Sequence, residues 1–64
     1  MKIGQTVYTV NAKTNKVDEW TLDSVLKSKK HKPLLVLTDG KHTGVFPHNA
    51  VYPTRARALE IAKL

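Results

Sequence analysis

The residues of this chain with the clearest potential for chemistry are its clustered lysines. Four lysines stand within the six residues from 27 to 32, and no acidic residue separates them. Like charges at this density repel one another, so we expect the segment to be a solvated loop or strand edge. It is a candidate site for phosphate groups or for an acidic protein, formed by Lys27, Lys29, Lys30 and Lys32. The competing interpretation is a loop whose charge only keeps a small protein in solution.

Three further cations extend this prediction. Arg55 and Arg57 fall in the first turn of an expected C-terminal helix, where free backbone N–H groups favour an anion. Lys41 follows a predicted turn. If the fold brought all seven residues together, they would form one surface for nucleic acid.

Aromatic residues supply a second kind of candidate contact. Trp20 and Tyr8 are possible stacking or partner-anchoring residues, because tryptophan and tyrosine are enriched at binding hot spots. The alternative for Trp20 is a central position in a small core. Tyr8 has the alternative of covering the core with its ring while its hydroxyl stays in water.

Catalytic and metal-binding groups are sparse. His31, His42 and His48 lack a cysteine or carboxylate set that completes the four ligands of structural zinc. His42 with Asp39 resembles a base and its orienting acid, but no serine or cysteine lies in a nucleophile motif. The three glycines are scattered and form no phosphate-binding loop. We therefore expect no enzyme activity, no metal and no cofactor.

Length and composition limit the class of protein. Sixty-four residues predict one domain with a small core, and the absence of cysteine excludes disulfides and thiolate metal sites. Stability must then come from apolar packing, a closed sheet or self-association, so a homo-oligomer is possible. The formal net charge of +6 favours nucleic acid or an acidic protein as the partner. No signal peptide or membrane-spanning run is evident, which predicts a cytoplasmic protein without membrane contact.

The elements that must position these residues read mainly as strands. Alternating Val, Tyr and Thr over residues 4–10 predict a first strand, and an Asn-rich turn over 11–16 precedes a second strand from about Val17. Residues 21–30 leave an alternative open. Leu22, Val25 and Leu26 have helical spacing, and Thr21 could cap a helix.

The second half of the chain has sharper signals. A buried strand over 34–38 and a strand over 43–46 flank Asp39-Gly40, a strong hairpin signal. A 3₁₀ turn is expected at 47–50, followed by a short fifth strand at Val51-Tyr52. A final helix over 55–64 is capped by Thr54 and packs through Ala58, Leu59 and Ala62, with Ile61 or Leu64 at the margin of that stripe.

This order of elements resembles SH3-like small barrels, including short phage, plasmid and bacterial accessory proteins. The opening Ile3-Gly4-Gln5-Thr6-Val7-Tyr8 is similar to their first strand, and Pro47-His48-Asn49-Ala50-Val51 to their 3₁₀ link. The resemblance implies a mainly β, five-stranded antiparallel SH3-like barrel with a short C-terminal α-helix. The single domain would span 1–64, with the barrel over about 3–52 and the helix over about 54–64.

The sequence thus predicts a small basic, non-catalytic binding module. The first hypothesis is contact with the phosphates of DNA or RNA through the lysine-rich loop. The alternative is a protein-interaction module, of the phage or plasmid accessory type, that docks on a host protein and modulates it. Members of SH3-like folds bind peptides, nucleic acids and proteins, so the resemblance does not choose between these hypotheses.

Overall fold

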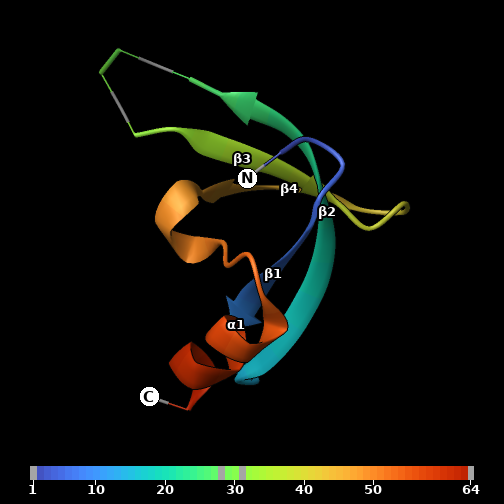
Figure 1. Ribbon diagram of the computed structural model, residues 1–64, viewed down its shortest axis with the longest axis vertical. Coiled ribbons are helices and arrows are strands. Elements are labelled where there is room, and N and C mark those ends of the chain that lie inside the picture. The colour runs from blue at the N-terminus through green and yellow to red at the C-terminus, as the bar shows by residue number, and fades with distance from the viewer. Residues whose placement is uncertain (1, 28, 31, 64) are drawn as a thin grey trace.

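The computed structural model describes residues 2–27, 29–30 and 32–63 of the protein (Figure 1). Four strands form one antiparallel sheet in the order β1-β2-β3-β4, and α1 packs against β1 and β2. The elements are β1 (Thr6–Asn11), β2 (Lys16–Leu26), β3 (Leu34–Thr38), β4 (Thr43–Pro47), the 3₁₀ turn η1 (His48–Ala50) and α1 (Arg55–Ala62). The predictions of a mainly β, antiparallel protein with a C-terminal helix are confirmed.

The prediction of a closed, five-stranded SH3-like barrel is wrong, because the sheet is open and has four strands. The expected fifth strand at Val51-Tyr52 is an isolated bridge. The backbones of Tyr8 and Tyr52 exchange two hydrogen bonds, of 2.9 and 2.8 Å. The pairing stops there, because among the described residues no further backbone hydrogen bond joins the neighbouring positions 50 and 54 to β1. One residue pair does not make a strand that closes a barrel.

Strand β2 is long and pairs with a different neighbouring strand along each of its halves. Its first half pairs with β1 over residues 16–21, and its second half pairs with β3 over residues 21–26. The register with β3 shifts between Leu22 and Ser24, which marks a β-bulge at Asp23. The extra residue places Val25 on the same face as Leu22. The strand prediction is therefore confirmed for 21–26, and the helix alternative is wrong there. Leu22 and Val25 share a face at a helical spacing because the bulge inserts one residue between them.

Turn chemistry places the ends of the strands as predicted. Oδ1 of Asp39 accepts hydrogen bonds from the backbone N–H groups of Lys41 and His42, at 2.8 and 2.6 Å, and Gly40 has a φ of 95°. A φ in this region favours glycine, which is why Asp39-Gly40 makes the hairpin turn. Oγ1 of Thr54 accepts from the backbone N–H of Arg57 at 3.2 Å and caps α1 as expected.

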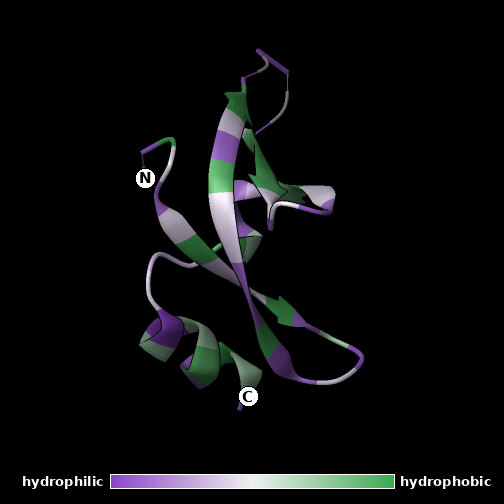
Figure 2. Cartoon of the chain, turned by 90° about the vertical axis from the view of Figure 1, so that its right-hand side faces the viewer, coloured by the Kyte–Doolittle hydropathy of each residue, from purple (hydrophilic) through white to green (hydrophobic). Residues whose placement is uncertain are grey.

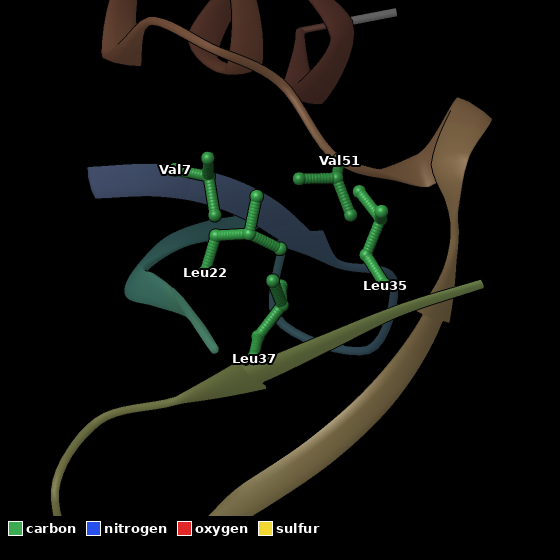
Figure 3. Close-up of a cluster of buried hydrophobic side chains, with 5 residues drawn as sticks. All are labelled: Val7, Leu22, Leu35, Leu37 and Val51. Atoms are coloured by element: carbon green, nitrogen blue, oxygen red, sulfur yellow. The ribbon is translucent and has the colours of Figure 1, made fainter. Parts of the chain in front are cut away.

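The core lies on one face of the sheet, between the strands and the chain that leads to α1 (Figure 3). Trp20, Val25 and Phe46 pack against its edge and are partly buried. In α1, Ala58 is buried but Leu59 is 41% exposed, so the predicted packing stripe was wrong at Leu59, and Leu64 lies outside the described residues. The buried apolar cluster consists of Val7, Leu22, Leu35, Leu37 and Val51.

Candidate functional site

The predicted lysine cluster lies in the loop that joins β2 to β3, at one end of the molecule (Figure 1). All four of its lysines are exposed, and we call them together the lysine loop: Lys27, Lys29, Lys30 and Lys32. The carbonyl oxygen of Pro33 accepts a hydrogen bond of 3.2 Å from the backbone N–H of His48, which ties the exit of the loop to η1. Ser28 and His31 of the same segment lie outside the described residues. The sequence therefore located this cationic surface correctly as a solvated loop.

The other predicted cations do not join the lysine loop. Lys41 belongs to the β3–β4 hairpin, at the opposite end of β3 from the loop. A strand of this length separates the two by roughly 15 Å. Figure 1 shows α1, with Arg55 and Arg57 in its first turn, at the far end of the longest dimension of the molecule, which measures 33 Å. The seven predicted nucleic-acid contacts thus occupy three separate regions.

The predicted anion site at the start of α1 is already partly occupied by the protein itself. Nη1 of Arg57 lies 3.1 Å from Oε2 of Glu60, one turn along the helix. Thr54 accepts the hydrogen bond from the backbone N–H of Arg57, one of the groups that an anion would use. Both observations weaken the case for an anion at this helix terminus.

Neither aromatic candidate offers an open stacking surface. Trp20 is half-buried, its Nε1 donates a hydrogen bond of 2.9 Å to Oγ1 of Thr9, and its ring lies 5.4 Å from that of Phe46 at 60°. Tyr8 is half-buried and faces Glu19 across the β1–β2 ladder. A carboxylate beside Tyr8 opposes the approach of a phosphate backbone. These contacts favour a structural role for Trp20 and leave little for a base to stack on.

The β3–β4 hairpin holds the one pair of groups that resembled catalytic residues. Nδ1 of His42 lies 3.4 Å from Oδ2 of Asp39, and both side chains are exposed. The backbone N–H of His42, then that of Lys41, hydrogen-bonds the carboxylate, and together they lower the pKa of Asp39. The pair therefore stabilises a turn. No cluster of three or more metal-ligating side chains occurs in residues 2–27, 29–30 and 32–63, and His31 falls outside them.

A shallow depression opens near the middle of the sheet. It has two carboxylates and several hydroxyl groups on its walls, a lining that suits neither phosphate nor an acidic peptide. A row of threonines in register, one from each strand, crosses the sheet here, and three of the four line the depression. The depression is lined by Thr6, Glu19, Trp20, Thr21, Thr38 and Asp39.

The sequence missed an apolar area on the face of the sheet opposite the core, which we call the outer face. Leu35 and Leu37 point into the core, so Leu34 and Val36 point to the outer face. Residues opposite one another in an antiparallel ladder share a face, and this places three more side chains there. Leu26 and Pro47 pair with Leu34, and Val45 pairs with Val36. The only signal in the sequence was apolar residues at every position of 34–37, which had predicted a buried strand. That prediction is wrong for the outer face, where Leu34 is 38% exposed.

Much of this apolar area is open to solvent. Leu26 is 50% exposed, Leu34 is 38% exposed and Val45 is 55% exposed. Figure 2 shows the same region, with hydrophobic β3 next to the hydrophilic loop that follows β2. Leu26 directly precedes Lys27, and Leu34 follows Lys32 after one proline. The lysine loop therefore borders the apolar part of the outer face.

No protein-family model, curated protein or solved structure matches this chain. Within the described residues, no helix has the length and apolar character that crossing a bilayer requires.

Proposed function

We propose that this protein is a non-catalytic binding module that docks on an acidic protein through the lysine loop. The observation that carries the proposal is the position of four exposed lysines beside exposed apolar side chains of the outer face. An interface between proteins needs both kinds of surface, because apolar contacts supply affinity while charges steer the encounter. The partner would meet the lysines with carboxylates.

Contact with nucleic-acid phosphates is the second candidate function. It is favoured by the density of lysines in the loop, which can neutralise several phosphates. It is disfavoured by the separation of Lys41, Arg55 and Arg57 from the loop, and by the internal contacts of Trp20. A nucleic-acid surface would gain from cations spread along one face and from open aromatic rings, whereas the predicted cations lie in three regions and Trp20 packs against the core.

The test is a fluorescence-anisotropy titration at two salt concentrations. The ligands are labelled poly-glutamate and labelled single- and double-stranded DNA and RNA. We expect poly-glutamate to bind at low salt. Its affinity should fall about tenfold or more when the loop lysines become glutamine, because each substitution removes one positive charge that attracts a carboxylate. Circular dichroism would verify that this variant, which carries Lys27→Gln, Lys29→Gln, Lys30→Gln and Lys32→Gln, stays folded.

A matched control separates the loop from the total charge. A second quadruple variant removes four charges from exposed lysines elsewhere: Lys2→Gln, Lys13→Gln, Lys16→Gln and Lys63→Gln. Equal losses of affinity in the two variants would mean that only the net charge matters, and the proposal would fail. Nucleic-acid binding that persists near physiological salt and disappears with the loop variant would instead establish the second candidate.

A further inference from the structure

The apolar rows of the outer face form a compact surface at the loop end of the sheet. The first row contains Leu26, Leu34 and Pro47, and the second contains Val36 and Val45, with the polar Ser24 opposite Val36 on β2. In the first row, three strands at about 4.8 Å spacing make the surface roughly 10 Å wide, and the two rows together extend about 7 Å along the strands. This width matches the diameter of one α-helix.

The inner face of the same sheet shows how such a surface is covered in this fold. There α1 packs on β1 and β2, and its Ala58 is fully buried. A helix on a sheet is one of the few stable ways to bury an apolar sheet face. The α-helix among the described residues, α1, covers the inner face. A helix on the outer face would therefore have to come from another molecule.

Charge specifies which helix suits the outer face. The lysine loop borders the apolar rows at one end, whereas Glu19 and Asp39 line the depression farther along the sheet. An occupant with carboxylates at the loop end would be attracted there and would avoid the acids at the other end. A second copy of this chain fits poorly, because two chains of net charge +6 repel each other.

We propose that the outer-face rows of Leu26, Leu34, Val36, Val45 and Pro47 bind the apolar side of an acidic amphipathic helix of a partner protein. The lysine loop then contacts the carboxylates at one end of that helix. This inference depends on the proposed function, because it assigns the loop to an acidic protein. It adds the apolar contacts and the helical form of the partner segment.

The experiment uses a labelled synthetic peptide as the probe. The peptide carries leucines at helical positions i, i+3, i+4 and i+7 and glutamates elsewhere, and a scrambled peptide of the same composition serves as its comparison. We expect the amphipathic peptide to bind more tightly than the scrambled one. We expect the protein variant Leu26→Thr with Val45→Thr to bind it about tenfold more weakly, because two exposed apolar contacts are lost.

A matched protein variant controls for the loss of any exposed apolar side chain. Ile3→Thr changes a residue that is 69% exposed and lies outside the rows, and we expect it to leave the affinity unchanged. Threonine is favoured in strands, so the Leu26→Thr and Val45→Thr changes should leave the sheet folded, which thermal unfolding would verify. A nuclear magnetic resonance titration should then show the largest amide shifts at Leu26, Leu34 and Val45.

The outcomes separate this inference from the proposed function. If the Leu26→Thr and Val45→Thr variant binds as the wild type does while the lysine-loop variant is weakened, the rows are not the docking surface and the loop function stands. If the loop variant is unaffected, the proposed function itself fails. Absence of binding by the amphipathic peptide at low salt overturns the inference. The inference is also overturned if the loop and outer-face substitutions weaken only the binding of nucleic acid or of anionic lipid vesicles, or only the self-association measured by sedimentation.

Discussion

The indole Nε1 of Trp20 donates a hydrogen bond of 2.9 Å to Oγ1 of Thr9, a side chain that is only 4% exposed. This bond satisfies the polar atoms of both residues at the edge of the core, and the Phe46 ring covers another side of the indole. Trp20 is therefore held by β1 and β4 together. Its side chain thus contacts both edge strands of the sheet.

Replacing Thr9 with valine tests this bond. We expect Thr9→Val to lower the free energy of unfolding by about 1–2 kcal/mol, because the half-buried indole N–H loses its acceptor. Urea unfolding followed by Trp20 fluorescence measures the change. The control is Thr6→Val, the same substitution at an exposed position of β1, which should stay within about 0.5 kcal/mol of the wild type. Equal effects at both positions would show that the bond does not stabilise the fold.

Truncation of Leu37 tests the core. This side chain is fully buried between β2 and β4, and Leu37→Ala should cost about 2–5 kcal/mol, because a cavity replaces its contacts. In a domain of this size such a loss is comparable to the whole stability, so the variant should be largely unfolded at 25 °C by circular dichroism. Leu26→Ala, on the outer face, should cost less than about 1 kcal/mol. A folded Leu37→Ala protein would contradict the assigned core.

Gly44 provides a test of close packing in β4. A Cβ at this position would lie 2.8 Å from Cε1 of Phe46, whose ring also contacts Trp20. Gly44→Ala should therefore destabilise the protein by about 1–3 kcal/mol through overpacking. In a double-mutant cycle the cost should shrink when Phe46→Leu removes the ring. An unchanged cost in that background would assign the effect to the backbone instead.

The pH dependence of stability tests the Asp39 turn. Hydrogen bonds from the backbone N–H groups of His42 and Lys41 lower the pKa of Asp39 in the folded protein. The unfolded chain has an aspartate pKa of about 3.9. A lowered folded pKa means that the carboxylate stabilises the fold above that value, and that this contribution is lost as pH falls through the folded pKa.

The measurement compares melting temperatures of the wild type and Asp39→Asn between pH 7 and pH 2.5. We expect the wild type to be more stable at pH 7 and the difference to shrink at the acidic end, because the asparagine does not titrate. Other carboxylates titrate in both proteins, so the difference between the two isolates Asp39. A difference that stays constant with pH would mean that the charge of Asp39 is irrelevant to the turn.

Local chemistry explains what the sequence determined. The Asp39-Gly40 hairpin, the Asn-rich turn before β2, the Thr54 cap and the alternation of β1 each depend on residues close together in the chain. Hydrogen bonds within a few residues and the two-residue period of a strand suffice to specify them. The exposure of the lysine loop was predictable for the same reason, because clustered like charges stay in water whatever the fold.

The tertiary structure alone decided how these pieces combine. The register with β3 shifts at the bulge at Asp23. Leu22 and Val25 therefore both face the core, although they are three residues apart in one strand. The sheet stayed open because Tyr52 makes a single pair with Tyr8 and the pairing extends no further. The apolar outer face and the distance from the lysine loop to Arg55 and Arg57 follow from strand pairing between distant residues. No local pattern specifies such pairing, since it depends on which faces the whole chain can bury at once.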